Sequence, residues 1–279
     1  MKSRLLLTFS LCTLASFPLL ANASVQCNEV DKDINFANNS IVTLEAFTGP
    51  IKSIVMTSTL PSDGRFKAIK SEITFDECGS LTKYHASLQE YTFGNIETNI
   101  IRMSESAPYD FKYKYQLKNR NYTHTFYVNE IFGKDANNLI NKKTSTFYNA
   151  AGEPIGKDIS QFTTKENRVV LEKVNITDAA DTNQKTIHYE YDSQKRLLKS
   201  IEDNIVTLSF KYDENGKILR QIQSFKGFHD ELKTYDFTCN EWDKYNNCLT
   251  WDLESTIKFD DRVVNYSKAL IHNQFEYYQ

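Results

Sequence analysis

The sequence predicts an all-β protein: a meandering antiparallel sheet built from hairpins, with few or no helices. A short phrase recurs along the chain: an aromatic residue, Asp or Asn, two turn residues, Gly or a substitute, one further residue and an apolar residue. Runs of alternating apolar and polar residues flank its copies, and most of the 16 Tyr and 18 Phe lie in such runs. Period-two alternation and aromatic enrichment are both typical of antiparallel strands.

The recurring phrase has the spacing of a hairpin turn. Its copies begin at Phe75, Tyr148, Tyr191, Tyr212 and Trp242, with a degenerate copy at Leu60. The first turn position accepts hydrogen bonds from nearby amides, and the fourth favours a positive φ, as in a type I turn with a G1 bulge. The residues expected in these structural roles are Asp192, Asp213 and Asp243 at the first position and Gly79, Gly152 and Gly216 at the fourth. Asn246 and Lys195 fill the fourth position of the other two copies.

Alternating runs around and between these turns predict the strands. The hairpins 186–191/196–201 and 206–212/217–225 are the clearest. Further strands are expected at 41–47, 51–57, 66–75, 111–117, 123–128 and 168–176, and one short helix at 134–143. The copies are spaced too unevenly for a strict solenoid, so we expect one continuous domain over 24–279, with a possible seam near 97–110.

The first 23 residues have the features of a secretory signal peptide. Lys2 and Arg4 precede an apolar run, and Ala21-Asn22-Ala23 forms a cleavage site before Ser24. We expect a periplasmic or secreted protein, and lipid anchoring is disfavoured because no Cys stands directly at the cleavage point. No later apolar stretch reaches membrane-spanning length, so no transmembrane segment is expected in the mature chain. The mature charge is 31 − 36 = −5, and an acidic excess without basic clusters argues against nucleic acid as a partner.

Four cysteines follow the signal: Cys27, Cys78, Cys239 and Cys248. An even number in an exported chain indicates disulfides, with three connectivities possible. Cys239 and Cys248 flank a predicted turn, which favours their local pairing and leaves Cys27 for Cys78. Zinc is the alternative, but the chain has no C-x-x-C and no His near either pair.

A search for chemistry predicts no catalytic, cofactor-binding or metal-binding residue. The five His stand far apart, and neither a G-x-S-x-G elbow nor a Gly-rich phosphate loop is present. Ser80 and Lys83 match S-x-x-K, but on a strand they would point to opposite faces. The acidic segment 178–183 lacks the Gly and the terminal Glu of an EF-hand.

Two resemblances accompany these patterns. The aromatic-Asp-x-x-Gly phrase resembles the Rhs or YD repeats of bacterial β-rich shell proteins. Four short motifs, in order, resemble the YnfC-like family of small exported lipoproteins of unknown function: 49–52 (GPIK), 76–78 (DEC), 153–157 (EPIGK) and the Cys239/Cys248 hairpin running to 276–278 (EYY). Members of that family carry a lipidated Cys, which this chain lacks at the cleavage point, and the resemblance implies no activity or site residue.

These observations favour a protein that binds rather than catalyses. We expect a protein partner, bound through a broad sheet face or a sheet edge, in envelope maintenance or in the neutralisation of a toxin. The alternative is an envelope-polymer hydrolase whose carboxylates are brought together by the fold. The sequence does not define the partner, the substrate or the oligomeric state.

Overall fold

A computed structural model describes residues 27–43, 47–59, 66–92, 96–104, 107, 109–119, 121–178, 182–226, 231–259 and 262–279. The expected signal peptide, its cleavage site before Ser24 and the degenerate turn at Leu60 lie outside the described residues. The described chain forms one helix and sixteen strands. Their bounds are α1 Glu29–Thr43, β1 Ile51–Thr59, β2 Phe66–Phe75, β3 Leu81–Thr92, β4 Ile96–Ser104, β5 Asp110–Lys118, β6 Thr123–Lys134, β7 Ile140–Tyr148, β8 Pro154–Lys165, β9 Arg168–Asp178, β10 Thr182–Tyr191, β11 Leu197–Glu202, β12 Ile205–Tyr212, β13 Ile218–Lys226, β14 Leu232–Trp242, β15 Cys248–Phe259 and β16 Arg262–Tyr277.

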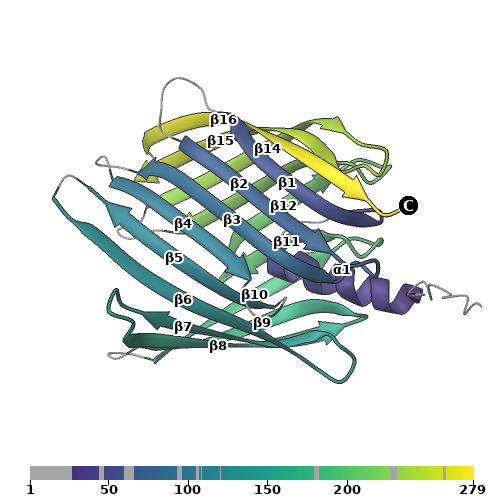
Figure 1. The fold of residues 1–279 in the computed structure, drawn as a ribbon, viewed down its shortest axis with the longest axis horizontal. Helices are drawn as coiled ribbons and strands as arrows, with labels where there is room; N and C mark the ends of the chain where they lie inside the picture. The colour runs from purple at the N-terminus through teal and green to yellow at the C-terminus, as the bar shows by residue number, and fades with distance from the viewer. Residues whose placement is uncertain are drawn as a thin grey trace, which may run out of the picture.

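The strands form a closed barrel in which each strand pairs antiparallel with its neighbours in the chain (Figure 1). The barrel closes where β1 pairs with β16, for example Ile54 opposite Phe275. The all-β prediction is confirmed, but the open meandering sheet is wrong. The twist and tilt of successive hairpins bring the last strand back to the first, and closure leaves neither β1 nor β16 as a free edge. Of the predicted seam at 97–110, residues 97–104 and 110 lie in β4 and β5, which pair with each other in this wall.

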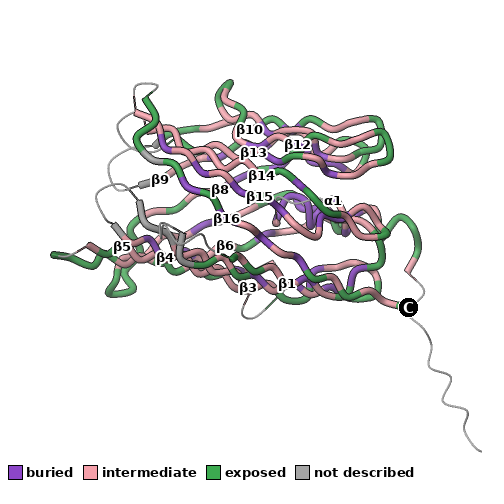
Figure 2. Tube along the Cα trace, turned by 90° about the horizontal axis from the view of Figure 1, so that it is seen from above, coloured by how far each residue is buried: buried purple, intermediate pink, exposed green. Residues whose placement is uncertain are grey.

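The side chains that face the inside of the barrel are mostly apolar. In β15, Trp251, Leu253, Ser255 and Ile257 are buried, and the residues between them are half-buried or exposed. Figure 2 shows that the barrel is flattened into two walls, with buried residues concentrated where α1 lies between them. The core of the protein is therefore the lumen itself, and the outer faces of the strands meet the surroundings.

Six hairpin turns share one hydrogen-bond pattern. In the turn at Asp213, the side chain accepts from the backbone N–H groups of Asn215 and Lys217, and Gly216 has a φ of 89°. The same two bonds are made by Asp76, Asp135, Asn149, Asp192 and Asp243, and the fourth position has positive φ at Gly79, Asn138, Gly152, Lys195 and Asn246.

One of these turns replaces the helix expected at 134–143, which is wrong. Asp135 and Asn138 form the β6–β7 turn instead. Here Lys134 stands where the other copies have an aromatic residue, so the phrase is incomplete although the Asp-x-x-Asn spacing is kept.

The helix α1 is compatible with the prediction of few or no helices, but it shows that the strand expected at 41–47 is wrong over residues 41–43. Its N-terminus is capped by Asn28, whose side chain accepts from the Asp31 N–H at 2.8 Å. Ile34, Ala37 and Ile41, spaced three and four residues apart, are buried against the barrel. Among the described residues, no helix is long and apolar enough to cross a membrane.

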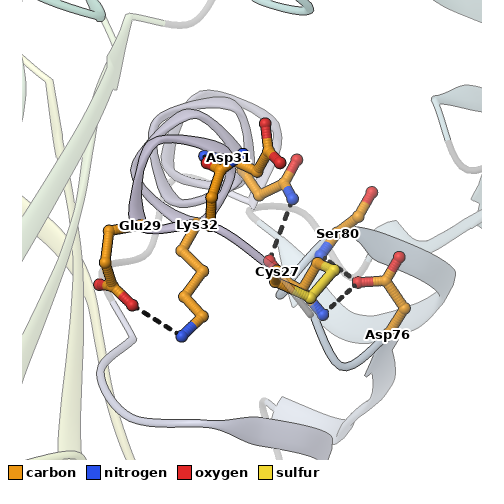
Figure 3. The surroundings of a disulfide bond; sticks show 9 residues. Cys27, Glu29, Asp31, Lys32, Asp76 and Ser80 are labelled. Carbon is orange, nitrogen blue, oxygen red and sulfur yellow. Dashed lines mark hydrogen bonds and ion pairs between the residues drawn. A yellow bond between two sulfur atoms is a disulfide. The ribbon is translucent and has the colours of Figure 1, made fainter. Parts of the chain in front are cut away.

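Both expected disulfides are present. Cys27, two residues before α1, pairs with Cys78 and so joins the N-terminal end of the helix to the β2–β3 turn (Figure 3). Cys239 pairs with Cys248 across the β14–β15 turn. Turns that follow even-numbered strands lie at one end of an up-and-down barrel, so both disulfides belong to the end that holds α1.

Candidate functional site inside the barrel

The helix α1 is held between the walls by polar contacts to the turns. Three buried asparagines of α1 reach turn backbone: Asn35 Nδ2 donates to the carbonyl of Cys78, Asn38 Nδ2 to that of Asn138, and Asn39 Nδ2 to that of Gly79. These bonds satisfy groups that burial beneath the helix removes from water. The helix is thus bonded to two turns that are distant in the sequence.

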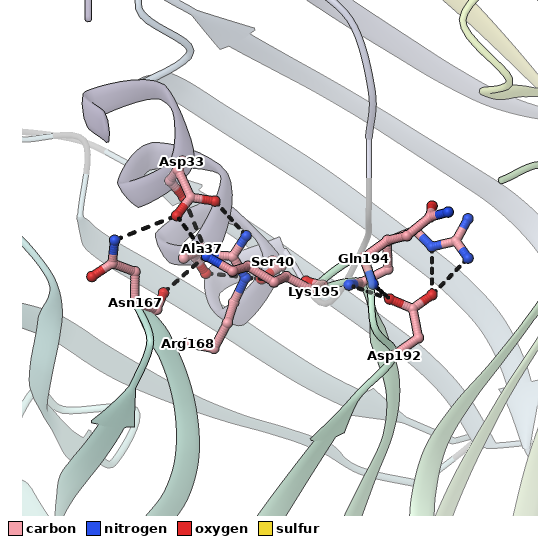
Figure 4. Close-up of polar contacts among 9 residues, drawn as sticks. Asp33, Ala37, Ser40, Asn167, Arg168, Asp192, Gln194 and Lys195 are labelled. Carbon is pink, nitrogen blue, oxygen red and sulfur yellow. Dashed lines mark hydrogen bonds and ion pairs between the residues drawn. The ribbon is translucent and has the colours of Figure 1, made fainter. Parts of the chain in front are cut away.

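An ion pair fixes α1 to the β8–β9 turn (Figure 4). Arg168 Nη2 donates to Asp33 Oδ1 at 2.6 Å, and Arg168 Nε donates to the carbonyl of Lys195 in the β10–β11 turn. Burial would raise the pKa of Asp33, but the hydrogen bond and the charge of Arg168 lower it overall. Several independent contacts therefore hold the helix in place at this end of the barrel.

An apolar cavity of about 390 Å³ lies in the lumen next to the C-terminus of α1. We call it the apolar chamber; its lining includes Met56, Ile69, Leu88, Trp251, Leu253 and Phe275. These side chains come from β1–β3 and β15–β16, which are contiguous in the barrel because β1 pairs with β16, and Tyr235 and Phe237 of β14 also line the cavity. A volume of this size and an apolar lining are typical of sites for small organic ligands.

A second cavity of about 680 Å³, the charged chamber, occupies the other part of the lumen. The charged side chains that line it are Arg102, Glu130, Lys143, Glu172, Lys185 and Glu202, together with Asp203 and Lys226. Four are basic and four are acidic, so the chamber is balanced in formal charge.

Two of the ion pairs in the charged chamber are nearly buried. Arg102 Nη2 lies 3.2 Å from Glu130 Oε1, and Lys143 Nζ lies 2.8 Å from Glu172 Oε1. Each carboxylate also accepts from a tyrosine hydroxyl, Glu130 from Tyr113 at 2.6 Å and Glu172 from Tyr189 at 2.7 Å.

The ionisation of these groups follows from their partners. Burial raises the pKa of Tyr113 and of Tyr189 well above the usual range, so both phenols remain hydrogen-bond donors. For Glu172, burial acts to raise the pKa, but the charge and hydrogen bond of Lys143 lower it overall. Buried charges of this kind are tolerated because each has an opposite charge and a further hydrogen bond.

The outer face of the barrel has the opposite character. Ion pairs between neighbouring strands lie on this outer face. Their side chains alternate along each strand with residues that point into the lumen. These pairs are Lys52–Glu276, Lys83–Glu72, Lys199–Glu190, Arg220–Asp236 and Lys268–Glu254. The outer face therefore carries exposed ion pairs, whereas the lumen combines an apolar chamber with a charged one.

The cysteines and turn residues predicted from the sequence do not come together at one site. The cysteines form the two disulfides, and Gly79, Gly216, Asp192, Asp213 and Asp243 lie in turns at the α1 end. Gly152 lies in the β7–β8 turn, at the opposite end. These positions support the wall of the barrel, whereas the lumen is built by other residues.

Sequence reasoning missed the lumenal charges Arg102, Glu130, Lys143 and Glu172. Each stands on an inward-facing position of its strand, where most of the neighbouring inward positions are apolar or aromatic. These charges at inward positions were visible in the sequence. For example, Glu172 stands between Val170 and Val174, which share its face of the strand. No group of three or more His, Cys, Asp or Glu suited to a metal ion occurs among the described residues.

Comparisons with known proteins add little to this geometry. No family model and no curated protein matches the chain. Among solved structures, the chain is similar to a porin-like protein from Bacteroides uniformis, with a TM-score of 0.36 and 10% identity over 82% of this chain and 99% of the other. A likeness this weak transfers neither fold nor function, so the functional argument depends on the lumen alone.

Proposed function

We propose that this protein is an exported, non-catalytic binding protein that encloses a small apolar or amphipathic molecule inside its barrel. The observation that carries the proposal is the apolar chamber, lined by side chains of several strands and set within a barrel whose outer face carries ion pairs. Burial in such a chamber removes apolar ligand surface from water, at about 25 cal/mol per Å².

The outer face also supports a water-exposed barrel. A barrel that spans a membrane presents an apolar band to lipid, and charged substitutions on that face are unfavourable. The outward ion pairs of this barrel, such as Lys83–Glu72, are suited to water. The two disulfides support an oxidising compartment such as the periplasm, in agreement with the expected signal peptide.

The sequence predicted a protein partner bound through a sheet face or a sheet edge, and the closed barrel changes the favoured mode of binding. Binding through a sheet edge loses its support, because β1 and β16 pair with each other and so leave neither as a free edge. Binding in the lumen replaces it as the favoured mode, and a partner on the outer face becomes an outcome of the test.

The test measures the affinity of the purified protein for a fluorescent naphthylamine probe. Ala86 lines the apolar chamber, and Ala86→Trp fills it; Thr57, exposed on the outside of β1, provides the control Thr57→Trp. We expect Ala86→Trp to weaken probe binding by about tenfold or more, the equivalent of about 1.4 kcal/mol, and Thr57→Trp to leave it unchanged.

Three outcomes would count against lumenal binding. The first is a wild-type protein that does not bind the probe. The second is a salt-sensitive protein partner captured equally by wild type and Ala86→Trp, which would favour the outer face. The third is cleavage of an envelope polymer that is abolished by substituting a single carboxylate, which would favour the hydrolase.

A further inference from the structure

The apolar and charged chambers adjoin inside the barrel. Arg102 and Tyr113 line both cavities from β4 and β5, and Gln223 and Phe225 line both from β13. In the order of the strands around the barrel, β13 lies across the lumen from β4 and β5. A molecule held between these strands therefore has an apolar cavity at one of its ends and a charged cavity at the other.

One ion pair of the charged chamber is accessible to a ligand. Lys185 Nζ donates to Glu202 Oε1 at 2.9 Å, and the two side chains are 42% and 31% exposed. Both line the chamber, in contrast to Glu172, whose side chain is 2% exposed. An ammonium group has three N–H donors and a carboxylate has about four lone pairs, so one ion pair uses only part of them. Lys185 and Glu202 thus present a donor and an acceptor side by side.

A donor next to an acceptor at this separation suits two neighbouring hydroxyl groups of one ligand. Adjacent hydroxyl oxygens on a sugar ring are separated by about the length of one hydrogen bond. One of them can accept from Lys185 while the other donates to Glu202, and the ion pair stays intact. Hydrogen bonds to ionised groups are stronger than those between neutral groups.

Phe225 adds an accessible aromatic ring to the same chamber. It is 48% exposed although it lines both cavities, and its ring centroid lies 5.9 Å from that of Tyr235. Glu202 is the last residue of β11 and Phe225 the last but one of β13, so both lie at the end of the barrel opposite α1. The face of an aromatic ring carries partial negative charge. It therefore packs favourably against the C–H groups of a sugar, which the hydroxyl groups polarise.

The charges of the chamber favour a ligand head without a charge. The four basic and four acidic side chains balance, and Lys185 and Glu202 are already paired with each other. A charged group on the ligand would stay uncompensated or would displace one partner of an existing pair, and both are unfavourable. Hydroxyl groups bind to the two ends of the pair without either penalty.

We propose, on the basis of the lumenal binding proposed above, that the ligand is a single-chain amphiphile whose head is an uncharged sugar. Its alkyl chain fills the apolar chamber. Its head lies in the charged chamber, where neighbouring hydroxyl groups bond to Lys185 and Glu202 and the ring packs against Phe225. Amphiphiles of the same chain length with charged heads, or with heads that lack hydroxyl pairs, bind more weakly.

Four amphiphiles with the same decyl chain test this proposal as competitors of the fluorescent probe, each below the concentration at which it forms micelles. They are decyl β-glucoside, tetraethylene glycol monodecyl ether, decyl sulfate and decylphosphocholine. The first two are uncharged but differ in their hydroxyl pairs. We expect the glucoside to bind the wild-type protein about tenfold or more tighter than the ether, because it adds hydrogen bonds to ionised groups. The sulfate and the phosphocholine should bind more weakly than the glucoside.

Two double variants locate the effect. Lys185→Met/Glu202→Met removes both charges of the accessible pair and should reduce the glucoside-to-ether ratio to near one, with the affinity for the ether unchanged. Lys199→Met/Glu190→Met is the matched control: this pair joins the same two strands on the outer face, at 3.0 Å and with similar exposure, and its loss should keep the ratio. Partly exposed pairs contribute little to stability, so both variants should fold, which their melting temperatures verify. If the first does not fold, the order of affinities for the wild type alone decides.

Equal affinity of the wild type for glucoside and ether would overturn the proposal. Tightest binding of the sulfate or the phosphocholine would do the same, as would a ratio that survives loss of Lys185 and Glu202. In each case, probe binding that remains sensitive to Ala86→Trp would preserve lumenal binding in general. Failure of the wild type to bind the probe at all would refute the proposed function and this inference with it.

Discussion

The nearly buried ion pair of Lys143 and Glu172 allows a quantitative prediction. The Glu172 side chain is 2% exposed, the Lys143 side chain is 22% exposed, and Nζ and Oε1 are 2.8 Å apart. In Glu172→Gln, the amide oxygen still accepts from Tyr189, but the ammonium of Lys143 loses its compensating charge. The substitution therefore removes the charge interaction and leaves the packing nearly unchanged.

The magnitude follows from the burial. Removing one partner of a buried ion pair destabilises a protein by about 3–5 kcal/mol. Because Lys143 keeps some exposure to the charged chamber, we expect a value at or just below the lower end of this range, about 2–3 kcal/mol. At about 2–4 °C per kcal/mol for a domain of this size, the melting temperature should fall by roughly 4–12 °C. The double variant Lys143→Met/Glu172→Gln should lie within about 1 kcal/mol of wild type, since it removes both charges.

Urea denaturation at several pH values measures this effect. The pKa of Glu172 is lowered in the folded protein from its ordinary value of 4.5, so its contribution is complete above that pH and is lost as the pH falls through the folded-state pKa. The pKa of Lys143 is raised, chiefly by Glu172 against the effect of burial, so its charge persists into the alkaline range. The difference between wild type and Glu172→Gln should shrink in acid only. A single variant as stable as wild type at pH 7, or a double variant less stable than the single one, would refute this reasoning.

Three further predictions concern the wall and the N-terminus. Loss of Cys27–Cys78 should cost about 4 kcal/mol and loss of Cys239–Cys248 about 2.5 kcal/mol, because the loops that they close span 51 and 9 residues; equal losses in urea denaturation would contradict the loop-entropy argument. Gly49→Ala should destabilise by about 2–4 kcal/mol, since φ is +91° and the added Cβ would lie 2.7 Å from the Tyr245 ring, whereas Gly152→Ala, with nothing within 4 Å, should cost about 1 kcal/mol; similar melting temperatures would show that the contact with Tyr245 relaxes. Mass spectrometry of the exported protein should find Ser24 at the N-terminus without acyl chains, and a lipidated Cys27 would disprove that cleavage site.

The hairpins were predictable from the sequence because their signals are local. The Asp at the first turn position and the residue of positive φ three positions later lie within one short phrase, as at Asp213 and Gly216. Closure of the barrel has no such signal. It depends on pairing between Ile51–Thr59 and Arg262–Tyr277, which lie at opposite ends of the described chain. The same hairpin sequences are compatible with an open sheet, so the choice between the two was not visible locally.

The helix and the lumenal site were missed for different reasons. In α1, Asn28 and the spacing of Ile34, Ala37 and Ile41 were available signals, but the asparagines that fix the helix are weak helix formers whose partners are distant turns. For the lumen, alternation shows that a strand has two faces without showing which one points inward. Charged residues such as Glu172 could therefore be assigned to a surface until the barrel placed them inside.

The distribution of stabilising contacts bears on how a molecule could reach the lumen. The end that holds α1 combines the two disulfides, the Arg168–Asp33 ion pair and the asparagine bonds to turn carbonyls. Opening it would break several of these contacts together, and Arg102 adds a bond to the last turn of α1 at Val42. The charged chamber, in contrast, extends to Asp203 in the β11–β12 turn at the opposite end. Because Cys27–Cys78 lies at the α1 end, its reduction should loosen α1, and a ligand that enters the charged chamber from the other end should still bind.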